Sequence, residues 1–96
     1  MLNIFAVKDK SNRIIYLTKE RWKHIITEHP VLSNKIENIK EAVINPLVIR
    51  KDSYNDKIRY YYLKDKIEKR YLLVIVKYLN NKGHIRTSFY VKNIKK

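Results

Sequence analysis

The stretch KRYLLVIVKYL, residues 69–79, constrains the fold of this chain more than any other segment. Because side chains on a β-strand alternate between its two faces, both faces of this strand would be apolar. Leu72, Val74 and Val76 share one face, and Leu73 and Ile75 share the other. A strand that must be covered on both faces belongs in the middle of a sheet, so the sequence predicts a central strand here.

Shorter segments with alternating or β-branched residues predict the neighbouring strands. They lie at residues 2–7, 13–17, 47–51, 58–64 and 84–91. The first two are separated by KDKSN, a turn-forming segment, and would form a hairpin. A second hairpin turn is predicted between the central and the last strand, at Asn80-Asn81-Lys82-Gly83.

The segment from residue 19 to residue 29 predicts a first helix, because its apolar side chains recur every three or four residues. These are Trp22, Ile25, Ile26 and His29. Thr18 is a suitable N-cap, and Pro30 would end the helix because the residue before a proline avoids the α-helical region. After Ser33, another apolar stripe predicts a second helix that ends at Asn45-Pro46: Ile36, Ile39, Ala42 and Val43.

This order of elements predicts an α+β fold, with two N-terminal strands and with two helices packed on one face of a roughly four-stranded antiparallel sheet. The 96 residues fit one domain, residues 1–96. Because the chain has no cysteine, disulfides and thiolate metal sites are excluded. The sequence shows neither a secretory leader pattern nor an apolar stretch long enough to span a membrane, which predicts a cytoplasmic protein without membrane association.

Charge is the strongest indication of function. Lys and Arg number 22 against 9 Asp and Glu, and the resulting net charge of +13 concentrates polyanions around the protein. RNA or DNA is therefore the expected partner, with binding that weakens steeply as salt rises. A coding bias toward Lys, Ile and Asn would explain some of the lysines, but less easily a surplus of this size.

The predicted last strand, HIRTSFYV, would expose polar residues on one face. Strict alternation places Ile85, Thr87, Phe89 and Val91 toward the core, and the opposite set outward: His84, Arg86, Ser88 and Tyr90. Lys77 would lie beside this outward set, together with Tyr60 and Tyr62 or, in the other register, Tyr61. Cations next to aromatic rings suit single-stranded RNA, although an ordinary solvated face has the same composition.

Four segments in this order resemble small phage- and toxin-associated nucleases of the barnase, EndoU, colicin and RelE-like superfamily of metal-independent ribonucleases. They are RWKHIITEHP, IKEAVINPLVIRK, YLLVIVKYL and GHIRTSFY, and the resemblance runs from about Tyr16 to Tyr90. It implies a helical front half packed on a four-stranded antiparallel sheet, with RNA cleaved by residues of the first helix and the last strands. It also implies a toxin or effector that is held by a partner, such as a cognate acidic inhibitor or antitoxin.

Metal-free RNA cleavage requires a base for the 2′-hydroxyl proton, cations for the charge on the phosphate, and an acid for the leaving 5′-oxygen. Imidazole suits the first and last roles. By the resemblance, His24 is the first candidate and His29 the second, because a histidine before proline also suits a helix cap. The two point about 140° apart around a helix, and a lone histidine is more often structural than catalytic.

Arginine grips phosphate at two points, so Arg86 is the expected phosphate ligand, with Lys77 as the second cation. The resemblance adds Thr87 and Tyr90 to the catalytic candidates, although alternation turns Thr87 toward the core unless the strand contains a bulge. Ser88 replaces Thr87 under strict alternation. The RNA-binding candidates are Lys77, Ser88, His84, Tyr62 and Arg21.

Neither a cofactor nor a metal is expected, because the chain lacks a glycine-rich phosphate loop and its histidines lack the spacing of a helical zinc site. The sequence therefore predicts a metal-independent endoribonuclease. Two alternatives stay open. One is a non-catalytic RNA-binding module that uses the same basic face, and the other is an interaction domain whose basic face docks an acidic partner.

Overall fold

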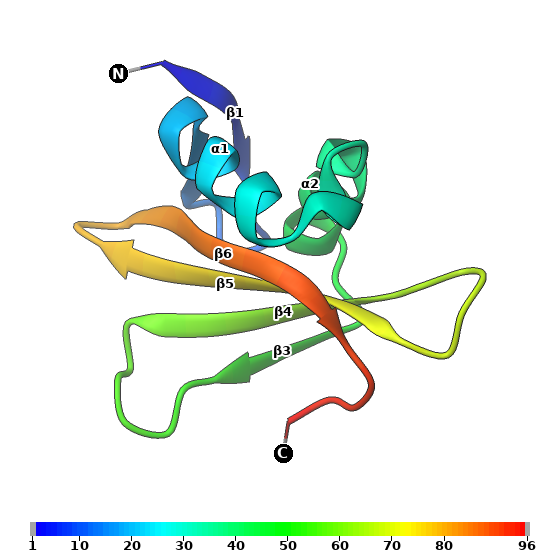
Figure 1. Cartoon of the computed structure of the whole chain (residues 1–96). Helices are drawn as coiled ribbons and strands as arrows, with labels where there is room; N and C mark the ends of the chain where they lie inside the picture. Colours follow the sequence, from blue (N-terminus) through cyan, green and yellow to red (C-terminus); the bar gives the residue numbers. More distant parts are fainter. Residues whose placement is uncertain (1, 96) are drawn as a thin grey trace.

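The computed structural model describes residues 2–95, which form two α-helices and a mixed sheet (Figure 1). The strands are β1 (Asn3–Lys8), β2 (Ile14–Thr18), β3 (Val48–Lys51), β4 (Ile58–Lys64), β5 (Tyr71–Leu79) and β6 (Lys82–Val91). The helices are α1 (Lys19–Glu28), the short 3-10 helix η1 (Pro30–Leu32) and α2 (Ile36–Ile44). Within residues 2–95, no helix is long and apolar enough to cross a membrane.

The predicted α+β class is confirmed, but the sheet is larger than the predicted four strands. Its six strands run in the order β1-β2-β6-β5-β4-β3. The last four strands pair antiparallel as predicted, and the N-terminal hairpin joins them through a parallel pairing of β2 with β6. Tyr16 pairs with His84 there, and Ile15 pairs with Gly83. Local periodicity contains no signal for such a pairing between distant segments, because it depends on tertiary contacts.

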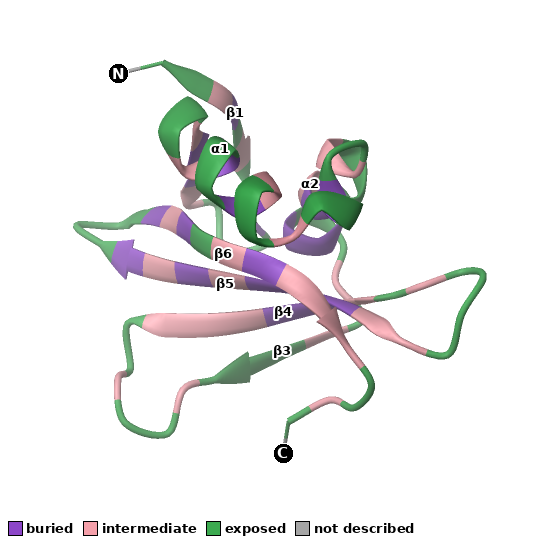
Figure 2. Ribbon diagram, in the orientation of Figure 1, coloured by how far each residue is buried: buried purple, intermediate pink, exposed green. Residues whose placement is uncertain are grey.

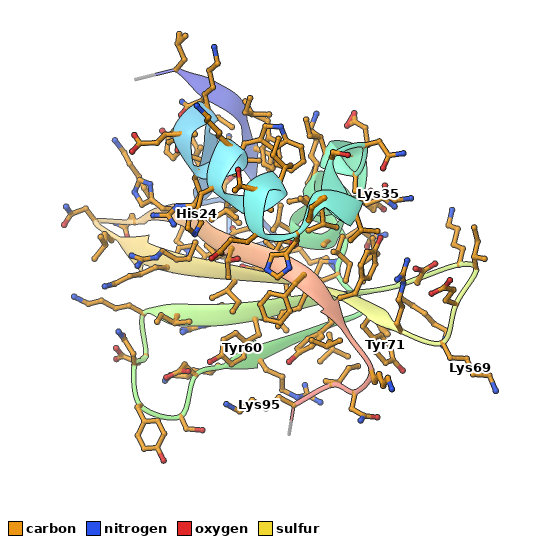
Figure 3. All side chains as sticks on the ribbon, in the orientation of Figure 1. His24, Lys35, Tyr60, Lys69, Tyr71 and Lys95 are labelled. Atoms are coloured by element: carbon orange, nitrogen blue, oxygen red, sulfur yellow. The ribbon has the colours of Figure 1, made fainter. Side chains whose placement is uncertain are left out.

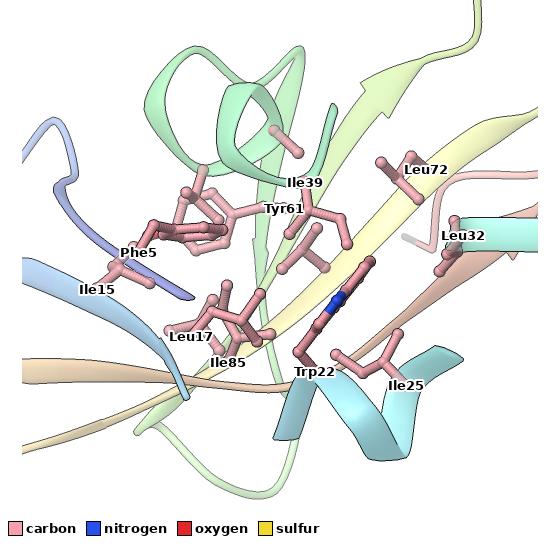
Figure 4. Close-up of a cluster of buried hydrophobic side chains, with 14 of the residues drawn as sticks. Phe5, Ile15, Leu17, Trp22, Ile25, Leu32, Ile39, Tyr61, Leu72 and Ile85 are labelled. Atoms are coloured by element: carbon pink, nitrogen blue, oxygen red, sulfur yellow. The ribbon is translucent and has the colours of Figure 1, made fainter. Parts of the chain in front are cut away.

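The hydrophobic core lies between the helices and one side of the sheet, which we call the helix face (Figures 2 and 4). Ile15, Leu17, Trp22, Ile25 and Ile39 are among its buried side chains. From the central strand β5, Leu72, Val74 and Val76 enter this core, as the alternation predicts. Leu73 and Ile75 lie on the opposite side of the sheet, which carries no helix and which we call the open face.

The start and end of α1 follow the sequence closely. The Thr18 side chain accepts a hydrogen bond of 3.1 Å from the backbone N–H of Arg21, so Thr18 is the predicted N-cap. The helix ends at Glu28, with Pro30 two residues later. Because Trp22 and Ile25 are buried, the helix turns His24 away from the core, and the His24 side chain is about half exposed.

The β5–β6 hairpin has a tighter turn than predicted. Asn80 and Asn81 adopt left-handed backbone angles, with φ of 53° and 65°, as the two central residues of a primed turn require. Gly83 lies inside β6 instead of in the turn. A Cβ atom on this glycine would come within 2.9 Å of both Ile15 Cγ1 and Tyr78 Cε1, so close packing against β2 and β5 requires a glycine here.

A β-bulge in β6 changes which face its later residues occupy. Val76 of β5 pairs with Ile85 and Ile75 pairs with Thr87, which leaves Arg86 without a partner on β5. The strict alternation predicted for this strand is therefore wrong beyond Ile85. Thr87 faces the open side together with His84, and Ser88 and Tyr90 face the helices.

A buried polar network ties the β1–β2 turn to the sheet. Tyr78 donates to the Asp9 carboxylate at 2.6 Å and is also hydrogen-bonded to Tyr61. The same carboxylate accepts hydrogen bonds from Ser11 and from the backbone N–H of Arg13. Burial by itself would raise the pKa of Asp9, but these hydrogen bonds outweigh it and lower the pKa below its usual value.

Candidate active site

A pocket of about 450 Å³ opens where β2 leaves the sheet and continues as α1. It is bounded by β2, α1, β5 and β6, and most of its polar lining is basic or aromatic. The residues concerned are Tyr16 and Thr18 of β2, Glu20, Arg21 and His24 of α1, Lys77 and Leu79 of β5, and His84, Ile85 and Arg86 of β6. Five of the ten sequence-predicted site residues therefore lie in one pocket: Arg21, His24, Lys77, His84 and Arg86.

Helix α1 presents His24 to this pocket beside β6 (Figure 3). The Nε2 atom of His24 lies 3.0 Å from Oε1 of Glu28, one turn further along the helix. This contact orients the imidazole, because a carboxylate that binds one ring nitrogen fixes how the ring is presented. Both side chains remain about half exposed, at 51% for His24 and 55% for Glu28, so the imidazole is accessible to a ligand.

The sheet contributes a row of three side chains on the open face. His84 pairs with Tyr16 on one side and with Lys77 on the other, so the three residues lie next to one another across the sheet. The Tyr16 and His84 rings are stacked, with centroids 5.8 Å apart and an angle of 22° between their planes. An imidazole between an aromatic ring and an ammonium group can bind both a base and a phosphate.

Arg86 enters the pocket because of the β-bulge, which frees it from pairing with β5. It is exposed, and neither Arg86 nor Lys77 forms an ion pair with any residue in the range 2–95. The guanidinium group can therefore bind an external anion without first breaking an internal contact. The structure brings His24 and Arg86 to the same pocket, and the roles predicted for the two residues stay predictions.

The structure places His29 and Thr87 outside this pocket. His29 is the C-cap of α1, and its ring stacks on Phe89 with centroids 5.5 Å apart. Its place at the helix end agrees with the capping alternative that the sequence left open. Thr87 lies on the open face one step beyond His84, opposite Ile75.

The remaining predicted residues are held by structural contacts. Ser88 is fully buried and donates its hydroxyl hydrogen to the Leu73 carbonyl at 2.8 Å. Tyr90 faces α2, and the Arg70 guanidinium lies 3.7 Å from the centre of its ring. Tyr62 is on the open face as predicted, but it is only 2% exposed and so cannot offer its ring to RNA. The bulge explains the misplacement of Ser88 and Tyr90, because it reverses the face of every later residue.

Sequence reasoning missed Tyr16 and Glu20 as pocket residues, and it missed Glu28 as the partner of His24. The position of Tyr16 between buried Ile15 and Leu17 showed that its ring leaves the core, but not what it would meet. Glu28 follows His24 by four residues, a spacing at which side chains meet on a helix, so that signal was available.

Charge is segregated among the elements in a way that favours polyanions on the sheet. None of the six strands contains an Asp or Glu, and the nine acidic residues all lie in helices and connecting segments. The strands carry cations instead, including Arg50, Lys77 and Arg86. Among residues 2–95, no three His, Asp or Glu side chains are grouped as metal ligands would be.

Comparison of the chain with protein families, with curated proteins and with solved structures found no match.

Proposed function

We propose that this protein is a metal-independent endoribonuclease that cleaves RNA in the pocket between α1 and β6. One observation carries the proposal: two imidazoles from different elements, His24 and His84, line a single pocket together with Arg21, Arg86 and Lys77. Attack of a 2′-hydroxyl on the adjacent phosphate requires an acid and a base, with cations beside them that are free to bind the phosphate. The net charge of +13 and the acid-free strands supply the field that attracts the substrate.

The reaction follows from the groups available. One imidazole removes the proton from a 2′-hydroxyl, whose oxygen attacks the adjacent phosphorus. The O2′–P bond forms as the P–O5′ bond breaks, and the second imidazole donates a proton to the leaving 5′-oxygen. The products are a 2′,3′-cyclic phosphate and a free 5′-hydroxyl. His24 and His84 fill these two roles, with Glu28 orienting His24 at 3.0 Å.

The cations stabilise the charge that develops on the phosphate. Arg86 projects from the bulge and can bind two non-bridging oxygens at once, while Lys77 provides a point charge in the next strand. In a cytoplasmic toxin of the kind that the sequence resembles, a cognate acidic inhibitor would compete with RNA for the same cations.

The decisive experiment is incubation of a labelled RNA with the protein in EDTA. We expect the wild type to cleave it and to leave a 2′,3′-cyclic phosphate, and we expect no cleavage where the RNA carries a single 2′-deoxy residue. His24→Ala should slow cleavage by about 100-fold or more.

His29→Ala is the matched control, because His29 is the C-cap of the same helix but packs against Phe89 instead of lining the pocket. It should leave cleavage near the wild-type rate. RNA that stays intact, or equal rates for both histidine variants, would rule out this mechanism. Salt-sensitive binding without scission would instead identify a non-catalytic RNA-binding module.

A further inference from the structure

The open face of the sheet extends beyond the pocket in a regular way. His84 and Lys77 form one cross-strand row, and the next row along the strands contains Thr87, Ile75, Tyr60 and Arg50. Successive rows on one face are about 7 Å apart, and neighbouring strands about 5 Å apart. Tyr60 and Arg50 therefore continue from Lys77 across β4 to the edge strand β3.

The C-terminal segment lies across the same face. The backbone N–H of Lys95 donates to the Tyr62 hydroxyl at 3.2 Å, which anchors the segment on β4. The Lys95 ammonium lies 5.4 Å from the centre of the Tyr60 ring (Figure 3). This contact places a third cation, after Lys77 and Arg50, beside an aromatic ring on the open face.

The Tyr60 ring is held in place by its hydroxyl. Tyr60 donates a hydrogen bond to the Asp52 carboxylate, which raises the pKa of Tyr60 to about 12. The ring therefore stays uncharged at physiological pH. The Asp52 carboxylate remains negatively charged, because the hydrogen bond from Tyr60 and the charge of Lys95 both lower its pKa.

We propose that single-stranded RNA leaves the pocket across the open face, along a track formed by Tyr60, Arg50 and Lys95. Tyr60 stacks against a base, and Arg50 and Lys95 bind phosphates on either side of it. Because RNA is the ligand, this track rests on the proposed function, but its binding role does not require cleavage. A duplex would present only phosphates to this face, because its bases are stacked on one another, so the track selects single strands.

Binding is measured with a fluorescent 2′-O-methyl oligonucleotide of roughly eight residues, which cannot be cleaved through a 2′-oxygen. Tyr60→Ala should weaken binding about tenfold through the loss of one stacked base. Tyr60→Phe keeps the ring but loses the hydrogen bond to Asp52 that holds it, so it should weaken binding less than Tyr60→Ala does. Tyr54→Ala is the matched control, because Tyr54 is 99% exposed on the β3–β4 turn and off the track.

The cations are tested through the salt dependence of the same binding. Lys95→Ala should make the slope of log affinity against log salt shallower by about 0.7, the value for one phosphate contact on a single strand. Lys69→Ala, which removes an exposed lysine on the β4–β5 turn, should leave the slope unchanged (Figure 3).

The outcomes separate this track from the proposed function. If RNA is never cleaved but Tyr60→Ala and Lys95→Ala have the expected effects, the track holds and the nuclease assignment fails. If cleavage depends on His24 while Tyr60→Ala binds no more weakly than Tyr54→Ala, the track is overturned. Equal binding of a duplex, or equal displacement by polyglutamate and by single-stranded RNA, would also overturn it, because either result needs only charge.

Discussion

Tyr78 and Lys77 are neighbours on β5, yet their side chains belong to two opposite kinds of polar cluster. Tyr78 points to the helix face, where it is 5% exposed and hydrogen-bonded to both Asp9 and Tyr61. Lys77 points to the open face, beside His84 and the pocket, and forms no ion pair within residues 2–95. Both clusters combine charged groups with aromatic rings.

The difference between them is whether the groups satisfy one another. In the Asp9 cluster, the carboxylate accepts hydrogen bonds from Ser11, Arg13 and Tyr78, and the Arg13 guanidinium covers the Tyr78 ring at 3.7 Å. Across residues 2–95, no buried side-chain polar atom is left without a partner. A cluster closed in this way has no group left for a ligand, so its contribution is to stability.

In the pocket, by contrast, the charged groups do not satisfy one another. Its cations outnumber its carboxylates. Arg86 is exposed, Lys77 is half-buried, and neither forms an ion pair within residues 2–95. Repulsion among unpaired cations disfavours folding, but such cations are free to bind an anionic ligand, as is typical of functional sites. Changes in the two clusters should therefore separate activity from stability.

The largest effect is expected from Arg86→Ala. Cleavage of RNA should fall by about 100- to 1,000-fold, because a preorganised donor to the developing charge is lost. The thermal unfolding midpoint should stay within error of the wild type, since Arg86 is exposed and has no pairing partner on β5. A parallel loss of folding, measured by circular dichroism, would mean that Arg86 belongs to the structural cluster instead. Lys69→Ala controls for the removal of one positive charge.

Asp9→Ala should have the opposite pattern. Four donors lose their acceptor, and we expect the free energy of unfolding to fall by about 3 kcal/mol. Cleavage per folded molecule should be unchanged at a temperature where the variant remains folded. Denaturant unfolding measures the first quantity, and Asp56→Ala, which removes an exposed carboxylate on the β3–β4 turn, is the control. Selective loss of cleavage in the folded variant would contradict the division into two clusters.

Low pH should lower the stability of the protein through Asp9, but by less than Asp9→Ala does. The pKa of Asp9 is lowered in the folded state from an ordinary value of 3.8, so the folded state stays deprotonated where the unfolded state takes up a proton. The stability from this group is complete above about pH 4 and is lost as the pH falls below it. Asp65, with its pKa lowered to about 2 by hydrogen bonds from Ile67 and Arg70, adds to the same trend.

Unfolding midpoints recorded from neutral pH down to about pH 3 test this expectation. The midpoint should fall less steeply with acid in Asp9→Asn than in the wild type, because only the contributions of Asp52 and Asp65, the other carboxylates with lowered pKa, remain. An identical acid dependence of the two proteins would show that the Asp9 network contributes no pH-dependent stability.

Local sequence patterns were enough to predict the helices, the strands and the distribution of charge. The doubly apolar run around Val74 predicted the central strand, the spacing of Trp22 and Ile25 predicted the buried side of α1, and Thr18 predicted where that helix begins. These features are local, because they follow from the backbone geometry of a strand or a helix and from which side chains avoid water. The exposure of His24 followed from the same helical period.

The way in which those elements form a pocket depends on tertiary contacts. The parallel pairing of β2 with β6 places Tyr16 beside His84 and α1 beside β6, and the bulge releases Arg86 while turning Ser88 and Tyr90 inward. Both depend on contacts between residues that are far apart in the chain. Period-two alternation cannot signal a one-residue bulge, because the extra residue is fixed by the register of the partner strand and not by its own neighbours.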